Sequence, residues 1–482
     1  MKKPLFATLG VAIAYTGAAW YTGYVGEQKF REQLELTKQQ PASVGMQLDL
    51  VKYERGIFTS QVELVIKPLS ELPLELVRLT SRAQHGPVLF GDGLGFGLYD
   101  MTSRFQLQLR DEQMNKDLQA ALGDKLGDIH SRVYFDASYD GSWGLDALAK
   151  EEDGTSLSMQ PSQVNFSGRL DSLSGEAQIK IGAINAKLAD GSHIDVAEIS
   201  GSVQVENLEP GVNLTNMTLT MPEVKGANGQ GVAFSLEGLS LAQLQTLNNN
   251  KIDTQVKLDM VKLVGPVVVE KAYYHISFNQ VDKAALKAIN ESMSRAAGVT
   301  DPEALQMVYL QVFTEALPLL LQEGLSAQLS LGAEFMGGKS EAVWNTRYVP
   351  PADGKTLTQL QGLEEYLQLV DSDLSVKAPA GLLQATPAST MVGTYLQEDN
   401  GNYLLKASFK AGELVIGNTT VPPEQWMTAL AGMSAMAQAG QAPAAGEADA
   451  YSDTDAYADA NAYEGADAEA EATEADAEAA TE

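Results

Sequence analysis

The chain has 482 residues, a formal net charge of −30 and no cysteine. The absence of cysteine excludes disulfides, thiolate catalysis and cysteine-ligated metal or iron–sulfur centres. A body this acidic is not expected to bind nucleic acid, because contact with phosphates requires clustered lysine and arginine side chains.

Residues 1–26 contain a long run without a charged side chain, which follows two lysines and ends before Glu27. The run is long enough to cross a bilayer, and lysines at its start would keep the N-terminus in the cytoplasm. The segment therefore predicts a membrane anchor or uncleaved signal. A secretory signal cut after Ala12-Ile13-Ala14 is the alternative. The residues predicted to lie at the membrane interfaces are Lys2, Lys3, Trp20, Tyr21 and Tyr24.

A juxtamembrane helix is predicted over residues 27–45, where charged side chains alternate with Phe30, Leu34 and Leu36. Residues 46–281 then alternate apolar and polar side chains, a pattern typical of antiparallel strands with one buried face. The clearest alternations are Leu48/Leu50, Val62/Leu64/Ile66, Phe105/Leu107/Leu109, Val133/Phe135/Ala137, Ala177/Ile179/Ile181, Val203/Val205, Met217/Leu219/Met221 and Val256/Leu258/Met260.

Residues 282–435 begin with a predicted helical pair, Asp282–Gly298 and Asp301–Gly324. The second helix starts with aspartate as N-cap and proline in the first turn. A short helix is predicted over Leu357–Val370, a hairpin that turns at Lys410–Glu413, and a last helix over Pro422–Met433.

The tail, residues 436–482, is rich in alanine, aspartate and glutamate, and it is predicted to be disordered because it has too few apolar residues to form a core. The predicted fold class is α+β: an N-terminal transmembrane helix, a predominantly antiparallel β-sheet body, a central helical pair and a disordered acidic tail.

No catalytic, cofactor-binding or metal-binding residue is predicted. The histidines His85, His130, His193 and His275 lack the spacing of a zinc site. The glycine-rich stretch His85–Gly97 has neither a helix N-terminus nor a lysine behind it, so it predicts a loop rather than a phosphate cradle.

The stretch "YERGIFTS" resembles a signature of the YdgA family of proteobacterial envelope proteins (DUF945). The signature residues are Tyr53, Arg55, Gly56, Phe58 and Ser60, and an H-G-P triplet of the family is matched by His85, Gly86 and Pro87. Trp20–Gly23, Thr314–Leu321 and Gly412–Asn418 extend the resemblance. The chain departs from the family pattern in Val88-Leu89-Phe90 after the triplet and in its acidic tail.

The resemblance implies a protein anchored in the inner membrane with its body in the periplasm, self-association into a homodimer, and a link to motility or envelope physiology. It implies no activity. From the residues themselves, the signature favours a structural corner over a ligand contact. Gly56 is expected at a positive φ, Arg55 stacked on Tyr53 or paired with a carboxylate, and Phe58 buried.

The first functional hypothesis is a non-enzymatic envelope protein that binds or scaffolds a protein partner through its β-rich body. A carrier that holds a lipid or another hydrophobic ligand on an apolar sheet face is the alternative. An enzyme of unrecognised type, using His85 or His130, is the third hypothesis.

Overall fold

The computed structural model describes residues 2–38, 46–68, 74–90, 93–116, 126–296, 307, 316–335, 338–351, 357–360, 365, 367–380, 395–399 and 401–423. Met1–Trp426 forms one compact unit. The predicted disordered tail lies outside the described residues, as do most of the predicted helix Asp301–Gly324 and nearly all of Pro422–Met433.

Helix α1 (Lys2–Lys38) is one continuous helix over the predicted anchor and most of the predicted juxtamembrane segment. The predicted transmembrane helix is wrong: no helix of the described residues combines the length and the apolar character needed to cross a membrane. Thr8, Thr16, Thr22 and several glycines dilute the apolar side chains of the predicted anchor.

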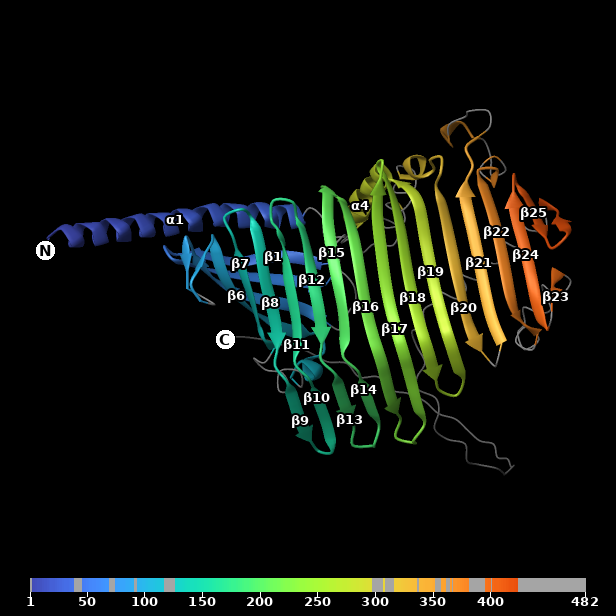
Figure 1. The fold of residues 1–482 in the computed structure, drawn as a ribbon, viewed down its shortest axis with the longest axis horizontal. Coiled ribbons are helices and arrows are strands. Elements are labelled where there is room, and N and C mark those ends of the chain that lie inside the picture. The colour runs from blue at the N-terminus through green and yellow to red at the C-terminus, as the bar shows by residue number, and fades with distance from the viewer. Residues whose placement is uncertain are drawn as a thin grey trace, which may run out of the picture. The chain divides into compact units, whose positions relative to one another are not determined.

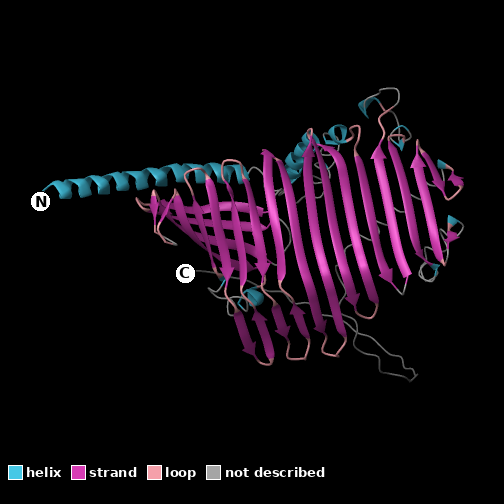
Figure 2. Ribbon diagram, in the orientation of Figure 1, coloured by secondary structure: helices cyan, strands magenta, loops and turns pink. Residues whose placement is uncertain are grey.

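The body is an antiparallel sheet, as predicted, but the α+β class is wrong because 24 strands of the described chain join in one sheet with few helices beside it. Figures 1 and 2 show the later strands side by side, with the first strands turned relative to them, as expected from the twist of large sheets. The first strands are β1 (Met46–Arg55), β2 (Thr59–Pro68), β3 (Leu74–His85), β6 (Tyr99–Leu109), β7 (Asp128–Val133) and β8 (Ser138–Leu145).

The pairing continues in a single order along the main sheet. From β8 it passes through β11 (Ser162–Arg169), β12 (Ser174–Ile181), β15 (Ile199–Glu209), β16 (Val212–Ala227), β17 (Ala233–Asn248), β18 (Lys251–Val264), β19 (Val268–Asp282), β20 (Ser326–Phe335), β21 (Gly338–Tyr348), β22 (Val370–Pro379), β24 (Asn402–Lys410), β25 (Glu413–Ile416) and β26 (Thr419–Val421). The remaining strands are β9 (Leu148–Glu152), β10 (Thr155–Met159), β13 (Ile184–Lys187), β14 (His193–Val196) and β23 (Gln397–Asp399), with a separate pair, β4 (Val88–Leu89) and β5 (Gly95–Phe96).

Two-residue turns fix the register of several hairpins. Asn249 and Asn250 join β17 to β18 with φ angles of 51° and 64°. Ala411 and Gly412 join β24 to β25 with φ angles of 51° and 83°, which confirms the hairpin predicted at Lys410–Glu413. Positive φ at both central positions gives a turn whose twist matches that of the flanking strands.

The register places mostly apolar side chains on one face of the sheet and mostly polar side chains on the other. Cross-strand partners share a face, and successive residues of a strand alternate between faces. One line of partners, here called the apolar row, crosses seventeen strands from β1 to β24. It consists of Tyr53, Val62, Ser81, Ser103, Ile129, Trp143, Val164, Ile179, Gly201, Leu219, Leu241, Leu258, Tyr274, Leu331, Ala342, Val376 and Leu405.

The adjacent residues of the same strands form a line of opposite character on the other face, here called the polar row. It consists of Glu54, Gln61, Arg82, Thr102, His130, Ser142, Asn165, Gln178, Ser202, Thr218, Ala242, Lys257, His275, Ser330, Val343, Ser375 and Lys406. Along these rows the sheet has a predominantly apolar face and a predominantly polar face; the exceptions are Ser81, Ser103 and Gly201 in the apolar row and Ala242 and Val343 in the polar row.

Helix α4 (Lys283–Ala296) corresponds to the first helix of the predicted pair. Its Leu286 packs against a buried cluster of Val212, Leu214 and Ile252 at the ends of β16 and β18. Residues 316–320 of the second predicted helix are helical. The predicted strand Val133/Phe135/Ala137 is wrong beyond Val133, because β7 ends there and Ala137 has a φ of 63° in the following turn.

Candidate functional site

The second half of α1 lies on the apolar face of the first strands. Its buried residues follow helical spacing, at Ala19, Thr22, Gly23, Gly26 and Leu34. Leu34 forms a core cluster with Val62 and Leu64 of β2, against which Phe30, Leu48, Leu50, Tyr53 and Leu79 also pack. The helix thereby covers the start of the apolar row.

Two glycines let the helix backbone approach the sheet closely. A Cβ atom at Gly26 would lie 1.1 Å from the Tyr99 hydroxyl oxygen, and one at Gly23 would lie 2.4 Å from Nδ1 of His85. The Tyr99 hydroxyl donates a hydrogen bond of 2.6 Å to the carbonyl oxygen of Thr22. Burial raises the pKa of Tyr99 well above its usual value, so the hydroxyl keeps its proton.

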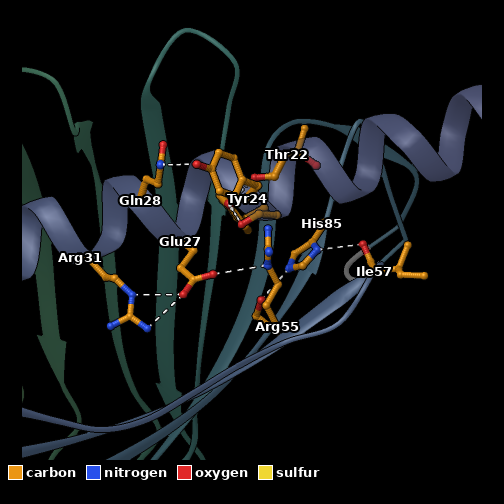
Figure 3. Close-up of polar contacts among 11 residues, drawn as sticks. Thr22, Tyr24, Glu27, Gln28, Arg31, Arg55, Ile57 and His85 are labelled. Carbon is orange, nitrogen blue, oxygen red and sulfur yellow. Dashed lines mark hydrogen bonds and ion pairs between the residues drawn. The ribbon is translucent and has the colours of Figure 1, made fainter.

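Arg55 of β1 connects the sheet to α1, where it forms an ion pair with Glu27 (Figure 3). Its guanidinium carbon lies 5.5 Å from the ring centroid of Trp20 and 5.3 Å from that of Tyr24, within cation–π range. Its Nε lies 3.4 Å from a carboxylate oxygen of Glu27, which also forms an ion pair with Arg31. Trp20 and Tyr24, predicted to lie at a membrane interface, are thus stacked on each other above an arginine of the same chain.

His85 and Ser60 are both 1% exposed beneath α1 and are hydrogen-bonded at 2.8 Å through Nε2 and Oγ. Nδ1 of His85 lies 3.1 Å from the carbonyl oxygen of Ile57 (Figure 3). A carbonyl only accepts, so Nδ1 carries the proton and Nε2 accepts from the Ser60 hydroxyl. Burial lowers the pKa of His85, which favours this neutral form.

A serine hydroxyl that donates to a histidine is also the geometry of an activated nucleophile. Here the orienting partner of His85 is a backbone carbonyl instead of a carboxylate, and Ser60 is too deeply buried to reach a substrate. The pair therefore links β2 to the end of β3 and supports the docked helix.

Gly86 and Pro87 complete the same junction through a cis peptide bond. The amide of Gly86 donates to Leu98, and its carbonyl oxygen accepts a hydrogen bond of 3.1 Å from the Thr22 hydroxyl. A Cβ atom at Gly86 would lie 1.6 Å from the carbonyl oxygen of Gly97, so only glycine fits. The loop predicted over His85–Gly97 contains the short β4–β5 hairpin.

Two expectations for the signature residues are wrong, and one of the two alternatives for a third is confirmed. Gly56 does not have a positive φ; its amide closes a tight turn onto the carbonyl oxygen of Thr59. Phe58 is 43% exposed and stacks on Tyr15 of α1 instead of being buried. Arg55 pairs with a carboxylate as expected, but its ring partners belong to α1.

Beyond α1, the apolar face is more exposed, most of all over β18 to β20. Val62, under the helix, is 5% exposed, whereas Leu258, Tyr274 and Leu331 on β18, β19 and β20 are 39%, 44% and 41% exposed. A hollow of about 410 Å³ lies further along the same face, lined by residues that include Leu331, Trp344, Leu374 and Phe409. The middle and far parts of this face therefore offer an apolar surface that the described residues leave open.

A second hollow, of about 470 Å³, lies over β6, β7, β8, β11 and β12, and most of its lining side chains belong to the polar face. Its lining includes His130, Asp140 and Glu176, together with Asp100 and Arg132, which form an ion pair. Within the described residues no group of three or more acidic or histidine side chains is placed to hold a metal ion. The carboxylate of Asp100 is neutralised by Arg132 and raises the pKa of that guanidinium.

Residues 1–441 match the family described as "Bacterial protein of unknown function (DUF945)". The chain belongs to the DUF945 family. It is 23% identical over 446 residues to Protein YdgA of Escherichia coli (strain K12), a match that covers 84% of this chain and 87% of that protein. No solved structure matches the chain.

In this DUF945 protein, the residues of the signature and of the H-G-P triplet gather at the α1 junction, whereas Gly412–Asn418, which extends the resemblance, lies at β25. Tyr53, Arg55, Phe58 and Ser60 lie on β1, on β2 or in the turn between them, and His85 to Pro87 lie at the end of β3. Sequence reasoning missed their common partner, helix α1. The signal was present in the spacing of Ala19, Gly23, Gly26, Phe30 and Leu34, which marks one small and apolar helix face.

Proposed function

We propose that this protein is a non-enzymatic binding protein that holds a lipid-like hydrophobic ligand on the apolar face of its sheet. The observation that supports this is the apolar row, which crosses seventeen strands and is open at Leu258, Tyr274 and Leu331. Soluble surfaces rarely expose contiguous apolar patches of this kind unless something binds there.

The chemistry of the face favours a lipid over a protein partner, the first hypothesis from sequence. Protein interfaces carry about one hydrogen bond per 100–200 Å² of buried area. A line of cross-strand partners runs beside the apolar row on the same face, and over β18 to β22 it consists of Val256, Ile276, Leu329, Trp344 and Leu374. The only hydrogen-bonding group among these side chains is the indole N–H of Trp344. That N–H already donates to Ser372.

A fluorescent long-chain fatty acid, titrated into the detergent-free full chain, tests the proposal. The informative variant is Leu258→Gln on the apolar face. Its matched control is Leu244→Gln, because Leu244 is also exposed, on the neighbouring strand, but pairs with Gln255 on the polar face.

We expect Leu258→Gln to weaken binding about 10- to 100-fold, because removing a buried leucine contact costs about 1.5–3 kcal/mol. Leu244→Gln should bind as the parent chain does. Absence of binding by the parent chain, or equal effects of the two substitutions, would overturn the proposal. The predicted location in the bacterial envelope remains a prediction that cell fractionation tests.

A further inference from the structure

The apolar row is much longer than one lipid chain. Its sixteen strand-to-strand steps, at roughly 4.8 Å each, make it about 75 Å long. An acyl chain reaches about half of a hydrocarbon core that is about 30 Å thick. Even without the first strands, which α1 covers, the row could hold several such chains in succession.

The row has no charged side chain beyond α1, and its only polar side-chain atoms there are the indole nitrogen of Trp143 and the hydroxyl oxygen of Tyr274. From Ile129 on β7 to Leu405 on β24, no residue of the row is charged. A second line of cross-strand partners runs beside the apolar row on the same face, from Phe166 on β11 to Ile416 on β25. Its polar side chains are Gln243 and the indole of Trp344. A chain that shifts by one strand exchanges one apolar contact for another, without desolvating a charge.

The row is also asymmetric. At its start Leu34 and Phe30 of α1 pack over β1 and β2, whereas Leu258, Tyr274 and Leu331 are open to solvent. A ligand can therefore enter over β18 to β20 and travel toward the first strands, where the docked helix stops it.

We propose, resting on the proposed function, that the apolar face is a continuous track for diacyl phospholipids. It holds two or more lipids at once, takes them in over β18 to β20, and lets their acyl chains move along the row as far as α1. A carrier with one enclosed site would instead hold a single lipid at one place.

The test uses the full chain with vesicles of phosphatidylethanolamine and phosphatidylglycerol that contain a phospholipid with a photoreactive acyl chain. Crosslinked peptides are identified by mass spectrometry, and native mass spectrometry counts the lipids bound per chain. The crosslinked peptides that test the track are those around Leu331 and Trp344, at the open end of the apolar row, and those around Val164 and Ile179, near the end that α1 covers.

A charge in the middle of the track should separate its two ends. Leu241→Lys places an ammonium group between Leu219 and Leu258 on the apolar face. Its matched control, Ala242→Lys, places the same group one residue away, on the polar face. Gln243→Lys is a second blocking variant, which replaces a side chain that is already polar and so perturbs packing less.

In the parent chain and in Ala242→Lys we expect crosslinks at both ends and at least two lipids per chain. In Leu241→Lys and Gln243→Lys we expect at least a fivefold loss of crosslinks near Val164, with those near Trp344 retained. One lipid per chain, or unchanged crosslinks in both blocking variants, would overturn the track but leave the proposed function standing. No crosslink to the apolar face in the parent chain, or a lipid-free dimer that buries this face, would overturn both.

Discussion

Replacing Gly26 by alanine tests whether α1 docks on the sheet as described. In an exposed helix the substitution stabilises by about 1 kcal/mol, because alanine restricts the unfolded chain and suits a helix. At Gly26 the new Cβ would lie 1.1 Å from the Tyr99 hydroxyl oxygen and 1.8 Å from its ring carbon. The tyrosine must move, which breaks its hydrogen bond to Thr22, worth about 1 kcal/mol.

Overpacking of a close contact adds about 1–3 kcal/mol. The net effect of Gly26→Ala is then a loss of about 1–3 kcal/mol in helix docking. Gly17→Ala is the matched control on the same helix, because no atom lies within 4 Å of its added Cβ, and it should stabilise slightly.

Hydrogen exchange of the amides between Ala19 and Leu34 measures the docking directly. Each 1.4 kcal/mol corresponds to a tenfold change in an opening equilibrium, so exchange in Gly26→Ala should be about 10- to 100-fold faster. Equal exchange and equal unfolding midpoints in the two variants would refute the docked geometry at Tyr99.

Three further predictions concern charged and titratable groups. Arg132→Met should cost about 2–4 kcal/mol in denaturant unfolding, because it leaves the carboxylate of Asp100, only 7% exposed, without its partner. Arg169→Met, at an exposed pair with Asp171, should cost clearly less; similar losses would contradict the inferred burial. Arg55→Lys keeps the charge but loses the planar stack on Trp20 and Tyr24, so it should weaken the docking of α1 by about 1 kcal/mol in the hydrogen-exchange assay. The control is Arg347→Lys, at an ion pair with Asp371, which should leave the exchange of the α1 amides unchanged. Burial lowers the pKa of His85 below the unfolded value near 6.5, so the unfolded state takes up a proton first and stability falls as the pH falls below about 6.5. His85→Gln should remove part of that fall between pH 7.5 and pH 5, and identical pH profiles would exclude His85 as its source.

The strands were predictable because alternation is a local signal. The pattern at Ala177/Ile179/Ile181 or Val256/Leu258/Met260 fixes which side chains share a face of their own strand. The hairpin at Lys410–Glu413 was predictable for the same reason, since two turn residues determine it. By contrast, the strand predicted from Val133/Phe135/Ala137 was wrong beyond Val133, because so short an alternation of apolar and polar residues also occurs in a turn.

The candidate site was not predictable to the same degree. The signature around Arg55 and the triplet at His85 are recognisable separately, but they are some thirty residues apart and neither indicates the other as a neighbour. Their common contact with α1 was hidden because Trp20 and Tyr24 suit a lipid interface as well as they suit a guanidinium group.

The sequence by itself determined that this chain builds an antiparallel sheet with one apolar and one polar side to each strand, because side-chain alternation depends only on neighbours along the chain. Only the tertiary structure decided that seventeen strands align their apolar sides into a single row, because the register between strands depends on turns and pairing. It also decided that α1 covers one end of that row. An apolar helix face fits a membrane or a sheet equally well, and the close approach of Gly23 to His85 and of Gly26 to Tyr99 distinguishes the two.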